Sequence, residues 1–452
     1  MHADIFYQTS IEDTIPLILV NQDFSLETFA AYEQNCMALQ QFKGKLGEIC
    51  LIHESSGILN KAYIGLGNGD KTFALAYAAN RLPPGKYALQ EPWSPTGLLA
   101  WSLAQYKFDR YKKHSIQPRV LAIPADVIPQ IQAESRAVFM VRDLINTPTN
   151  DMGPKDLAKV MTDLAHENHA EFREWVGDEL LADNFPAIHA VGRAAATPPC
   201  LLSLTWGNVS HPKVTLIGKG VCFDSGGLDL KSSSNMRLMK KDMGGAAQVI
   251  GLAALLMSRR LPIRLQILIP AVENAIGGDA YRPGDILTMR NGLHVEIDNT
   301  DAEGRLVVAD ALVKACEENP ELIIDFTTLT GAARIAVGTE ISAFFTNSEA
   351  LAQSLMESAE TTHDPLWRMP LYAGYESMLD SSIADLTNSS PSSYAGAITA
   401  ALFLQRFVTK GTEWAHFDIM AWNISNKPGK PEGGEAMGLR AVADYLSKKY
   451  SA

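Results

Sequence analysis

Charged side chains gather in a glycine-containing segment that follows a strongly apolar run of the sequence. The apolar run covers residues 213–218, and Lys219, Asp224, Lys231 and Asp242 come after it. In sheets that helices cover on both faces, ligands bind beyond the carboxyl ends of the strands. We therefore expect these four side chains to contribute to a functional site. The alternative is a loop that carries ordinary surface charges.

A second charged cluster, formed by Asp301, Glu303 and Arg305, follows another strand-like run. On an extended segment this spacing turns all three side chains to one side, whereas on a helix the first two diverge by about 200°. We therefore expect an extended segment here, followed by a helix that begins near Leu306. An acidic helix cap would explain Asp301 or Glu303 singly, but it would leave Arg305 without a role.

Two divalent metal ions would account for both clusters if the clusters converge. Four carboxylates crowded together repel one another, and some must bind protons unless cations lie among them. Two such ions carry the matching positive charge, and carboxylates can bridge a metal pair about 3.5 to 4 Å apart. A donor set rich in oxygen fits Mg²⁺, Mn²⁺ or Zn²⁺. The spacing alone leaves a charged surface loop as the alternative.

The composition is that of a folded, acidic protein. The 452 residues are 46% hydrophobic and 20% charged, within the globular range. A net charge of −12 argues against a general nucleic-acid-binding surface. No run reaches the roughly 18 apolar residues of a membrane span, and the first residues lack the features of a signal peptide. We therefore expect a cytoplasmic protein that does not enter the membrane, with its five scattered cysteines reduced.

Strand-like and helical runs alternate along the whole chain, which predicts an α/β fold. The length favours two domains over one. We expect a small N-terminal α/β domain over residues 1–127, a connecting helix over 128–146, and a larger C-terminal domain over 147–452. The larger domain should have α/β/α layers around a mixed central sheet, with strands near residues 201–206, 213–220, 265–272 and 322–329.

Several of these segments resemble one enzyme family. The sequence NTDAEGRL (299–306) is similar to the signature of the leucyl aminopeptidase (cytosol aminopeptidase) family and matches it without a mismatch. GKGVCFDSGG, KSSSNMRLMKKDMGGAA and AYRPGDI (280–286) resemble further blocks of that family, in the same order. The resemblance covers about residues 135–440, and before residue 120 it extends only to length and α/β pattern.

The resemblance implies two divalent metal ions, Zn²⁺ or Mn²⁺ or both, with Mg²⁺ as a further option. Their ligands would be Lys219, Asp224, Asp242, Asp301 and Glu303. Asp224 and Glu303 would bridge the metals, Asp301 would complete one site, and Lys219 with Asp242 would complete the other. Lys219 must then be a neutral amine, which moves its pKa from near 10.4 to below 7 and costs roughly 5 kcal/mol.

The activity implied by the resemblance is the release of N-terminal amino acids from peptides by a metal-bridging hydroxide. Lys231 would stabilise the oxyanion, and Arg305 would hold a bicarbonate that moves the proton. The resemblance places four residues along the pocket for the first side chain, which are Met239, Asn299, Thr328 and Gly331. Met239 at the pocket floor predicts a preference for leucine and other apolar residues, although plain packing explains such a methionine equally well.

The resemblance also implies a homohexamer that acts on peptides with a free N-terminus. Two alternatives stay open at this point. One is a regulatory or nucleic-acid-binding protein that retains the fold, against which the intact ligand set and the acidic charge argue. The other is a dipeptidase, such as a Cys-Gly hydrolase, which differs only in its substrate.

Overall fold

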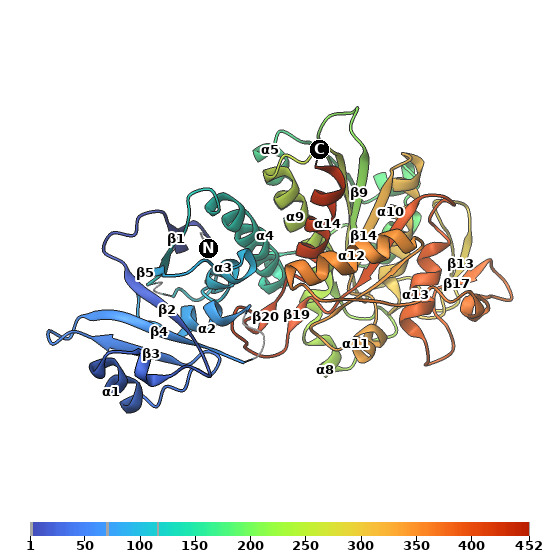
Figure 1. Ribbon diagram of the computed structural model, residues 1–452. Coiled ribbons are helices and arrows are strands. Elements are labelled where there is room, and N and C mark those ends of the chain that lie inside the picture. The colour runs from blue at the N-terminus through green and yellow to red at the C-terminus, as the bar shows by residue number, and fades with distance from the viewer. Residues whose placement is uncertain (1–2, 69–71, 115–116, 452) are drawn as a thin grey trace. The chain divides into compact units, whose positions relative to one another are not determined.

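The chain folds into two compact units, here called unit 1 and unit 2 (Figure 1). The computed structural model describes residues 3–68, 72–114 and 117–451. Unit 1 consists of Met1–Phe139 and Ile424–Glu432, and unit 2 consists of Met140–Asn423 and Gly433–Ala452. The helix expected over residues 128–146 is present as α4 (Ile128–Asn146), and the division between the units falls inside it.

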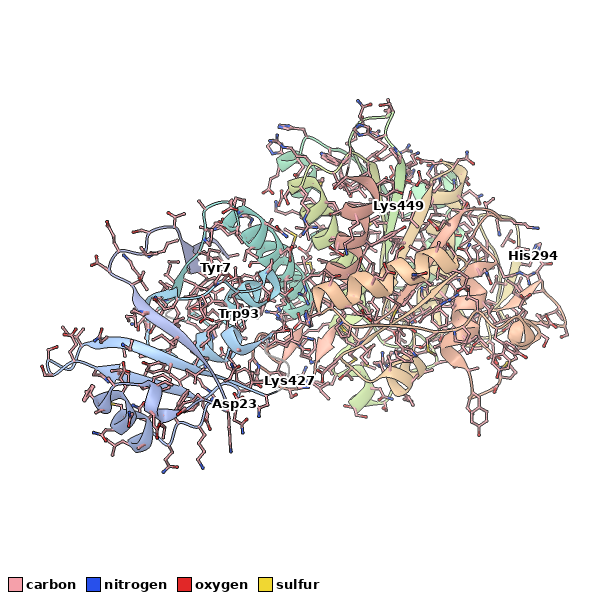
Figure 2. All side chains as sticks on the ribbon, in the orientation of Figure 1. Tyr7, Asp23, Trp93, His294, Lys427 and Lys449 are labelled. Carbon is pink, nitrogen blue, oxygen red and sulfur yellow. The ribbon has the colours of Figure 1, made fainter. Side chains whose placement is uncertain are left out.

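Unit 1 contains a six-stranded sheet in which β3 pairs with β4 in antiparallel fashion and the other pairs are parallel. Its strand order is β1 (Tyr7–Gln8), β6 (Arg119–Ala122), β5 (Gly85–Leu89), β2 (Ile15–Asn21), β4 (Leu59–Gly67) and β3 (Ile49–His53). Its helices are η1 (Ala3–Phe6), η2 (Leu26–Thr28), α1 (Ala31–Leu39), α2 (Ala74–Arg81) and α3 (Pro95–Leu103). Tyr7, labelled in Figure 2, ties the sheet edge to α3 because its hydroxyl donates to the Leu98 carbonyl at 2.7 Å.

Unit 2 is built on a nine-stranded mixed sheet, which confirms the expected α/β fold with a mixed central sheet. Along its main path the order is β16 (Leu366–Arg368), β15 (Ser342–Thr346), β18 (Glu413–Asp418), β14 (Leu322–Thr327), β9 (Lys213–Gly218), β11 (Arg264–Asn274), β8 (Cys200–Trp206) and β7 (Glu171–Val176). β10 (Gly220–Asp224) pairs in parallel with the far end of β11. The central strands β18, β14, β9 and β11 are mutually parallel, so their carboxyl ends meet at one edge.

Helices cover both faces of this sheet, as strand β9 shows. Successive side chains of a strand point to opposite faces. A side chain at Gly218 would meet Ala246 of α9 (Gly244–Ser258) at 2.6 Å, whereas Ile217 belongs to the apolar core that includes Leu306 of α10 (Glu303–Glu317). The helices α9 and α10 therefore lie on opposite faces, and the strands between them are apolar because both faces are buried.

The remaining elements of unit 2 extend these layers. They are η3 (Thr149–Asp151), α5 (Pro154–Glu167), α6 (Glu179–Ala182), α7 (Pro186–Gly192), α8 (Ser233–Met236), η4 (Met239–Met243), β12 (Ile286–Thr288), β13 (His294–Glu296), α11 (Gly331–Val337), α12 (Glu349–Thr362), η5 (Ala373–Leu379), β17 (Leu386–Thr387), α13 (Gly396–Gln405), β19 (Trp422–Asn423), β20 (Gly433–Gly434) and α14 (Leu439–Tyr450). Among the described residues, no helix is both long enough and apolar enough to cross a membrane.

Candidate metal centre

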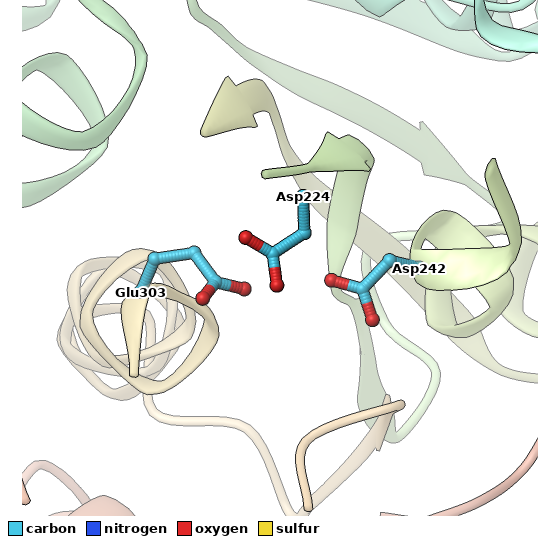
Figure 3. Close-up of side chains that lie close together, drawn as sticks. All are labelled: Asp224, Asp242 and Glu303. Carbon is cyan, nitrogen blue, oxygen red and sulfur yellow. The ribbon is translucent and has the colours of Figure 1, made fainter. Parts of the chain in front are cut away.

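Three buried carboxylates from distant parts of the sequence meet at the carboxyl edge of the central sheet. Asp224 ends β10, Asp242 lies in η4, and Glu303 is the first residue of α10. Figure 3 shows the three carboxylate groups turned toward one another. One oxygen from each lies within 4.8 Å of the others. The structure thus brings together side chains from both charged clusters of the sequence.

Two lysines lie between these carboxylates. Lys219 Nζ is 2.7 Å from Asp242 Oδ2 and 2.8 Å from Glu303 Oε1. Lys231 Nζ is 2.8 Å from Asp224 Oδ2 and also contacts Asp301 Oδ1. The site therefore alternates negative and positive groups, and Asp301 joins it through Lys231.

The pKa values of the site reflect this crowding. Burial, and then the charge of Asp224, raises the pKa of Glu303 to about 8. The same two causes raise the pKa of Asp301 to about 6. Burial opposes the charge of Lys219, but Asp242, Glu303 and Asp224 outweigh it and raise its pKa. The carboxylates therefore favour the ammonium form of Lys219. A metal cation bound by these carboxylates would weaken that effect and allow Lys219 to lose its proton.

Four of the carboxylate oxygens at this site fit metal ligation. Asp242 Oδ2, Asp301 Oδ1 and both carboxylate oxygens of Glu303 are buried and accept no hydrogen bond of good geometry from the described residues. Buried acceptors are normally satisfied, and buried carboxylates commonly pair with cations or coordinate metals. Oxygen donors grouped in this way are those that divalent cations prefer, so the residues present fit a divalent cation.

A glycine lets Lys219 reach the centre. A Cβ atom at Gly304, in the first turn of α10, would lie 2.5 Å from Lys219 Cε and 2.7 Å from Lys219 Nζ. The lysine side chain therefore crosses the helix surface where any larger residue would push it aside. This contact could not be predicted from the sequence, because Lys219 and Gly304 are far apart along the chain and only the fold brings them together.

The expectation of an extended segment over residues 301–305 is wrong. Helix α10 begins at Glu303, so Glu303 and Arg305 lie in its first turn and only Asp301 precedes it. Asp301, Glu303 and Arg305 nevertheless all line one cavity. The helix places the Glu303 carboxylate at its N-terminus, where the helix dipole favours negative charge.

Polar side chains outside the predicted set connect the two charged clusters of the sequence by hydrogen bonds. Asn274 Nδ2 donates to Asp224 Oδ1 at 2.9 Å and to the Thr300 carbonyl at 3.0 Å. Thr300 in turn is bound to Asp229, since its backbone N–H donates to Asp229 Oδ2 at 2.7 Å. Tyr281 donates to the same Thr300 carbonyl at 2.6 Å. These residues were missed because their partners are distant in the sequence, although Tyr281 lies in a recognised block.

Arg305 is held by a loop near α13. Its Nη1 atom donates to the Asn388 carbonyl at 2.7 Å, while its buried Nε atom has no hydrogen-bond partner among the described residues. Burial lowers the pKa of Arg305 to about 10. The side chain of Asn388 also accepts from Asn299 N–H at 3.2 Å. The guanidinium group is thus fixed through Nη1, while its buried Nε atom lacks a partner among the described residues.

A cavity of about 640 Å³ contains the carboxylate and lysine groups. Three of the four predicted pocket residues line it, which are Met239, Thr328 and Gly331. Asn299 is not among the lining residues, and its Oδ1 atom instead accepts from Asp301 N–H at 2.7 Å. Thr328 lines the cavity, but its hydroxyl donates to Asp242 Oδ1 at 2.7 Å and so orients that carboxylate.

The chain matches one family of known proteins over most of its length. Residues 139–443 match the catalytic domain of the cytosol aminopeptidase family, and residues 15–124 match the N-terminal domain of aminopeptidases of that type. A probable cytosol aminopeptidase from Syntrophotalea carbinolica is 37% identical over 450 residues, which are 90% of this chain and 90% of that protein. Peptidase B from Serratia proteamaculans is 41% identical over 72% of this chain and 78% of its own length.

Solved structures give the same result for the fold. The crystal structure of a cytosol aminopeptidase from Coxiella burnetii aligns with a TM-score of 0.95 and 47% identity, over 98% of this chain and 99% of that one. The bottromycin maturation enzyme BotP, in complex with Mn, aligns with a TM-score of 0.88 and 30% identity, over 97% of this chain and all of that one.

Proposed function

This chain belongs to the cytosol aminopeptidase family, and from that premise we propose that it hydrolyses peptides with a free N-terminus to release the first residue at the site described above. The observation that carries the proposal is the meeting of Asp224, Asp242 and Glu303, which approach within 4.8 Å of one another. Buried carboxylates at this spacing need cations between them, and a site of this kind supports hydrolytic chemistry.

Five residues would hold two divalent cations, which are Lys219, Asp224, Asp242, Asp301 and Glu303. Lys219 would join them as a neutral amine. Bound there, the cations would polarise the scissile carbonyl group and make a water molecule acidic enough to attack it. The complex of BotP with Mn supports Mn²⁺ as one candidate.

The chain's own cationic groups would act on the reacting peptide. Lys231 Nζ is held between Asp224 and Asp301, at the wall of the cavity, and would donate to the oxyanion that forms during attack. Arg305 would hold a small anion such as bicarbonate through its unpartnered Nε atom. Arg305 itself is a poor proton carrier, because its pKa stays near 10, so such an anion would be needed to move a proton.

A chromogenic leucyl amide tests this function. With Mn²⁺ or Zn²⁺, the purified protein should cleave the unblocked leucyl amide and leave its N-acetylated form intact, because the free α-amine is part of what the site binds. Met239 in the cavity wall supports acceptance of leucine. Equal cleavage of the blocked and unblocked amides would contradict an aminopeptidase.

Metal binding can be tested without any substrate. Added Mn²⁺ should raise the melting temperature of the wild-type protein, because a ligand that binds only the folded state stabilises it. The Glu303→Gln variant should show a smaller rise, since it loses one carboxylate of the buried group. An equal rise in both proteins would place the metal elsewhere.

A further inference from the structure

Asn388 is a buried residue that contacts the metal-bearing segment from outside the cavity. None of its surface is exposed, and it is not among the residues that line the cavity of the metal centre. Its side chain faces the turn over residues 298–302, which carries Asp301 and leads into α10. A polar side chain that reaches neither solvent nor the cavity can act on the site only through the residues that it binds.

The side-chain amide of Asn388 uses all of its polar groups on this turn. Its Oδ1 atom accepts from Asp298 N–H at 2.8 Å and from Asn299 N–H at 3.2 Å. Its Nδ2 atom donates to the Asn299 carbonyl at 2.7 Å and to the Ala302 carbonyl at 3.4 Å. An asparagine amide offers one acceptor oxygen and two donor hydrogens, so the backbone of the turn satisfies each of them.

This amide takes the place of a neighbouring strand. β13 pairs in parallel with β17, and the backbone N–H of Asn388 still donates to the Glu296 carbonyl at 2.9 Å. Both strands end here, and the Asn388 side chain then binds the N–H and the carbonyl group of Asn299, as the backbone of a paired strand would. The turn thus has a defined conformation although it lies outside the sheet.

The turn directs Asp301 toward the metal centre. Asn299 Oδ1 accepts from Asp301 N–H at 2.7 Å, so the position of Asn299 fixes that of Asp301. Asp301 Oδ1 contacts Lys231 and is a buried oxygen that accepts no hydrogen bond of good geometry from the described residues. Asn388 is therefore connected to one of the proposed metal ligands through a single intervening residue.

The backbone of Asn388 holds the same segment at a second point. Arg305 Nη1 donates to the Asn388 carbonyl at 2.7 Å. Asp301 lies just before α10 and Arg305 lies in its first turn, with Glu303 between them. Asn388 therefore contacts this chain segment both before and after Glu303, the proposed bridging ligand.

We propose that Asn388 is a positioning residue of this enzyme, whose side-chain amide holds the 298–302 turn so that Asp301 can bind a metal ion. This inference rests on the proposed aminopeptidase function and adds a residue to that site. Because Asn388 lies outside the cavity, we expect its effect on metal binding to pass through Asp301.

The Asn388→Asp variant tests this role, because it keeps the size of the side chain and its acceptor but replaces the donor nitrogen by an oxygen. That oxygen would face the carbonyl groups of Asn299 and Ala302, which can offer it no hydrogen. Calorimetric titration with Mn²⁺ should show that one ion binds at least about tenfold more weakly than in the wild type, the usual loss when a group that orients a metal ligand is removed. The kcat for the leucyl amide should fall by a similar factor.

The Asp301→Asn background separates positioning from general damage to the fold. If Asn388 acts through Asp301, adding Asn388→Asp to Asp301→Asn should weaken Mn²⁺ binding by less than about twofold further, because the effects of two residues that act as a unit do not add. The same tenfold loss in both backgrounds would show that Asn388 acts by another route and would overturn the proposal.

Asn347→Asp is the matched control. The Asn347 amide also bridges backbone groups, since it donates to the Thr412 carbonyl at 2.8 Å and accepts from Trp414 N–H at 3.0 Å. These contacts lie at the start of β18, whereas the metal centre lies at the carboxyl edge of the sheet. Mn²⁺ affinity should therefore be unchanged in this variant, and a loss equal to that of Asn388→Asp would contradict a specific role for Asn388.

A second substitution covers the case in which Asn388→Asp does not fold. Asn388→Ala also removes the donors to Asn299 and Ala302, without adding a charge, and carries the same expectation. Wild-type Mn²⁺ affinity and turnover in a folded Asn388 variant would overturn the positioning role and leave the aminopeptidase function standing. A wild-type protein that binds no Mn²⁺ and cleaves no unblocked amide would overturn the function and the positioning role together.

Discussion

Lys231, for which we propose a catalytic role, is held firmly by its surroundings. Its ammonium group is held at 2.8 Å from Asp224 and in contact with Asp301, and burial is outweighed by these carboxylates, which raise its pKa. These carboxylates therefore favour the charged form of Lys231. We predict that Lys231→Met lowers kcat by about 100- to 1000-fold, the usual loss when one donor to an oxyanion is removed.

Metal analysis of the same variant separates chemistry from binding. Lys231→Met should still hold metal, because the predicted ligands are unchanged. Lys159→Met is a suitable control, since Lys159 forms an exposed pair with Asp163 in α5, and such pairs contribute little. Full activity of Lys231→Met with normal metal content would show that another group stabilises the oxyanion.

The sequence predicted which residues form the site better than it predicted where each side chain points. The types and order of the carboxylates, together with the family resemblance, identified the residues that meet in the structure. Asn299 was expected to line the pocket for the first side chain. It is not among the residues that line the cavity, and its Oδ1 atom accepts a hydrogen bond from Asp301 N–H. The sequence shows two adjacent lysines, Lys240 and Lys241, and only the structure shows that Lys241 lines the cavity and Lys240 does not.

At the level of elements, the first turn of α10 leaves space for the Lys219 side chain, because residue 304 is a glycine. We predict that Gly304→Ala folds normally but loses most activity. The new methyl group would lie 2.5 Å from Lys219 Cε, and the flexible lysine side chain would move away more readily than the helix backbone. Lys219 would then lie too far away to act as a ligand.

Activity, bound metal and melting temperature together check this prediction. Alanine favours the helix over glycine by about 1 kcal/mol, and this gain opposes the cost of crowding Lys219. The melting temperature should therefore change little. Low activity with reduced metal content would agree with a displaced Lys219. Wild-type activity in Gly304→Ala would mean that the lysine is not needed at its observed position.

A buried carboxylate further along α10 should make the stability of the protein depend on pH. Asp310 accepts hydrogen bonds from Ala187 N–H at 2.8 Å and Ile188 N–H at 3.3 Å, at the start of α7. Burial, only partly offset by hydrogen bonds from Arg290, Ala187 and Ile188, raises its pKa to about 7. The unfolded value is about 3.9. Between these pH values the folded chain binds more protons, so the free energy of unfolding falls as pH rises and levels off above pH 7.

The Asp310→Asn variant isolates this effect. Since it has no proton to lose, the difference in unfolding free energy between wild type and variant should change by roughly 1.4 kcal/mol per pH unit at its steepest. Urea unfolding at a series of pH values between 4 and 8 measures that difference. A constant difference across the range would contradict a raised pKa for Asp310.

Long apolar elements were predictable, and polar turns were not. The strand expected over 322–329 appears as β14 (Leu322–Thr327), and the helix expected to begin near Leu306 appears as α10, which begins at Glu303, because burial imposes a pattern on their apolar residues. The segment before α10 was misread as extended. Its residues are polar and carry no helical periodicity, so the hydrogen bonds that Asn299 N–H donates to Asn388 and Thr300 N–H donates to Asp229 could not be predicted from the sequence.

At the scale of the whole molecule, the family resemblance predicts a homohexamer, and this assembly stays a prediction for the present chain. Analytical ultracentrifugation should show a species about six times the mass of the single chain, and dilution should not dissociate it at micromolar concentration, as expected for large obligate interfaces. A single species at the monomer mass would contradict the prediction.

The division of the chain into units has a consequence for its synthesis. Unit 1 is not continuous, because Ile424–Glu432 belongs to it and the polypeptide therefore passes between the units three times. Domains usually begin to fold from the N-terminus while the ribosome is still at work. Here unit 1 lacks Ile424–Glu432 until the whole of Met140–Asn423 has been translated. We therefore expect unit 1 to complete its fold only after the long segment between its two pieces has left the ribosome.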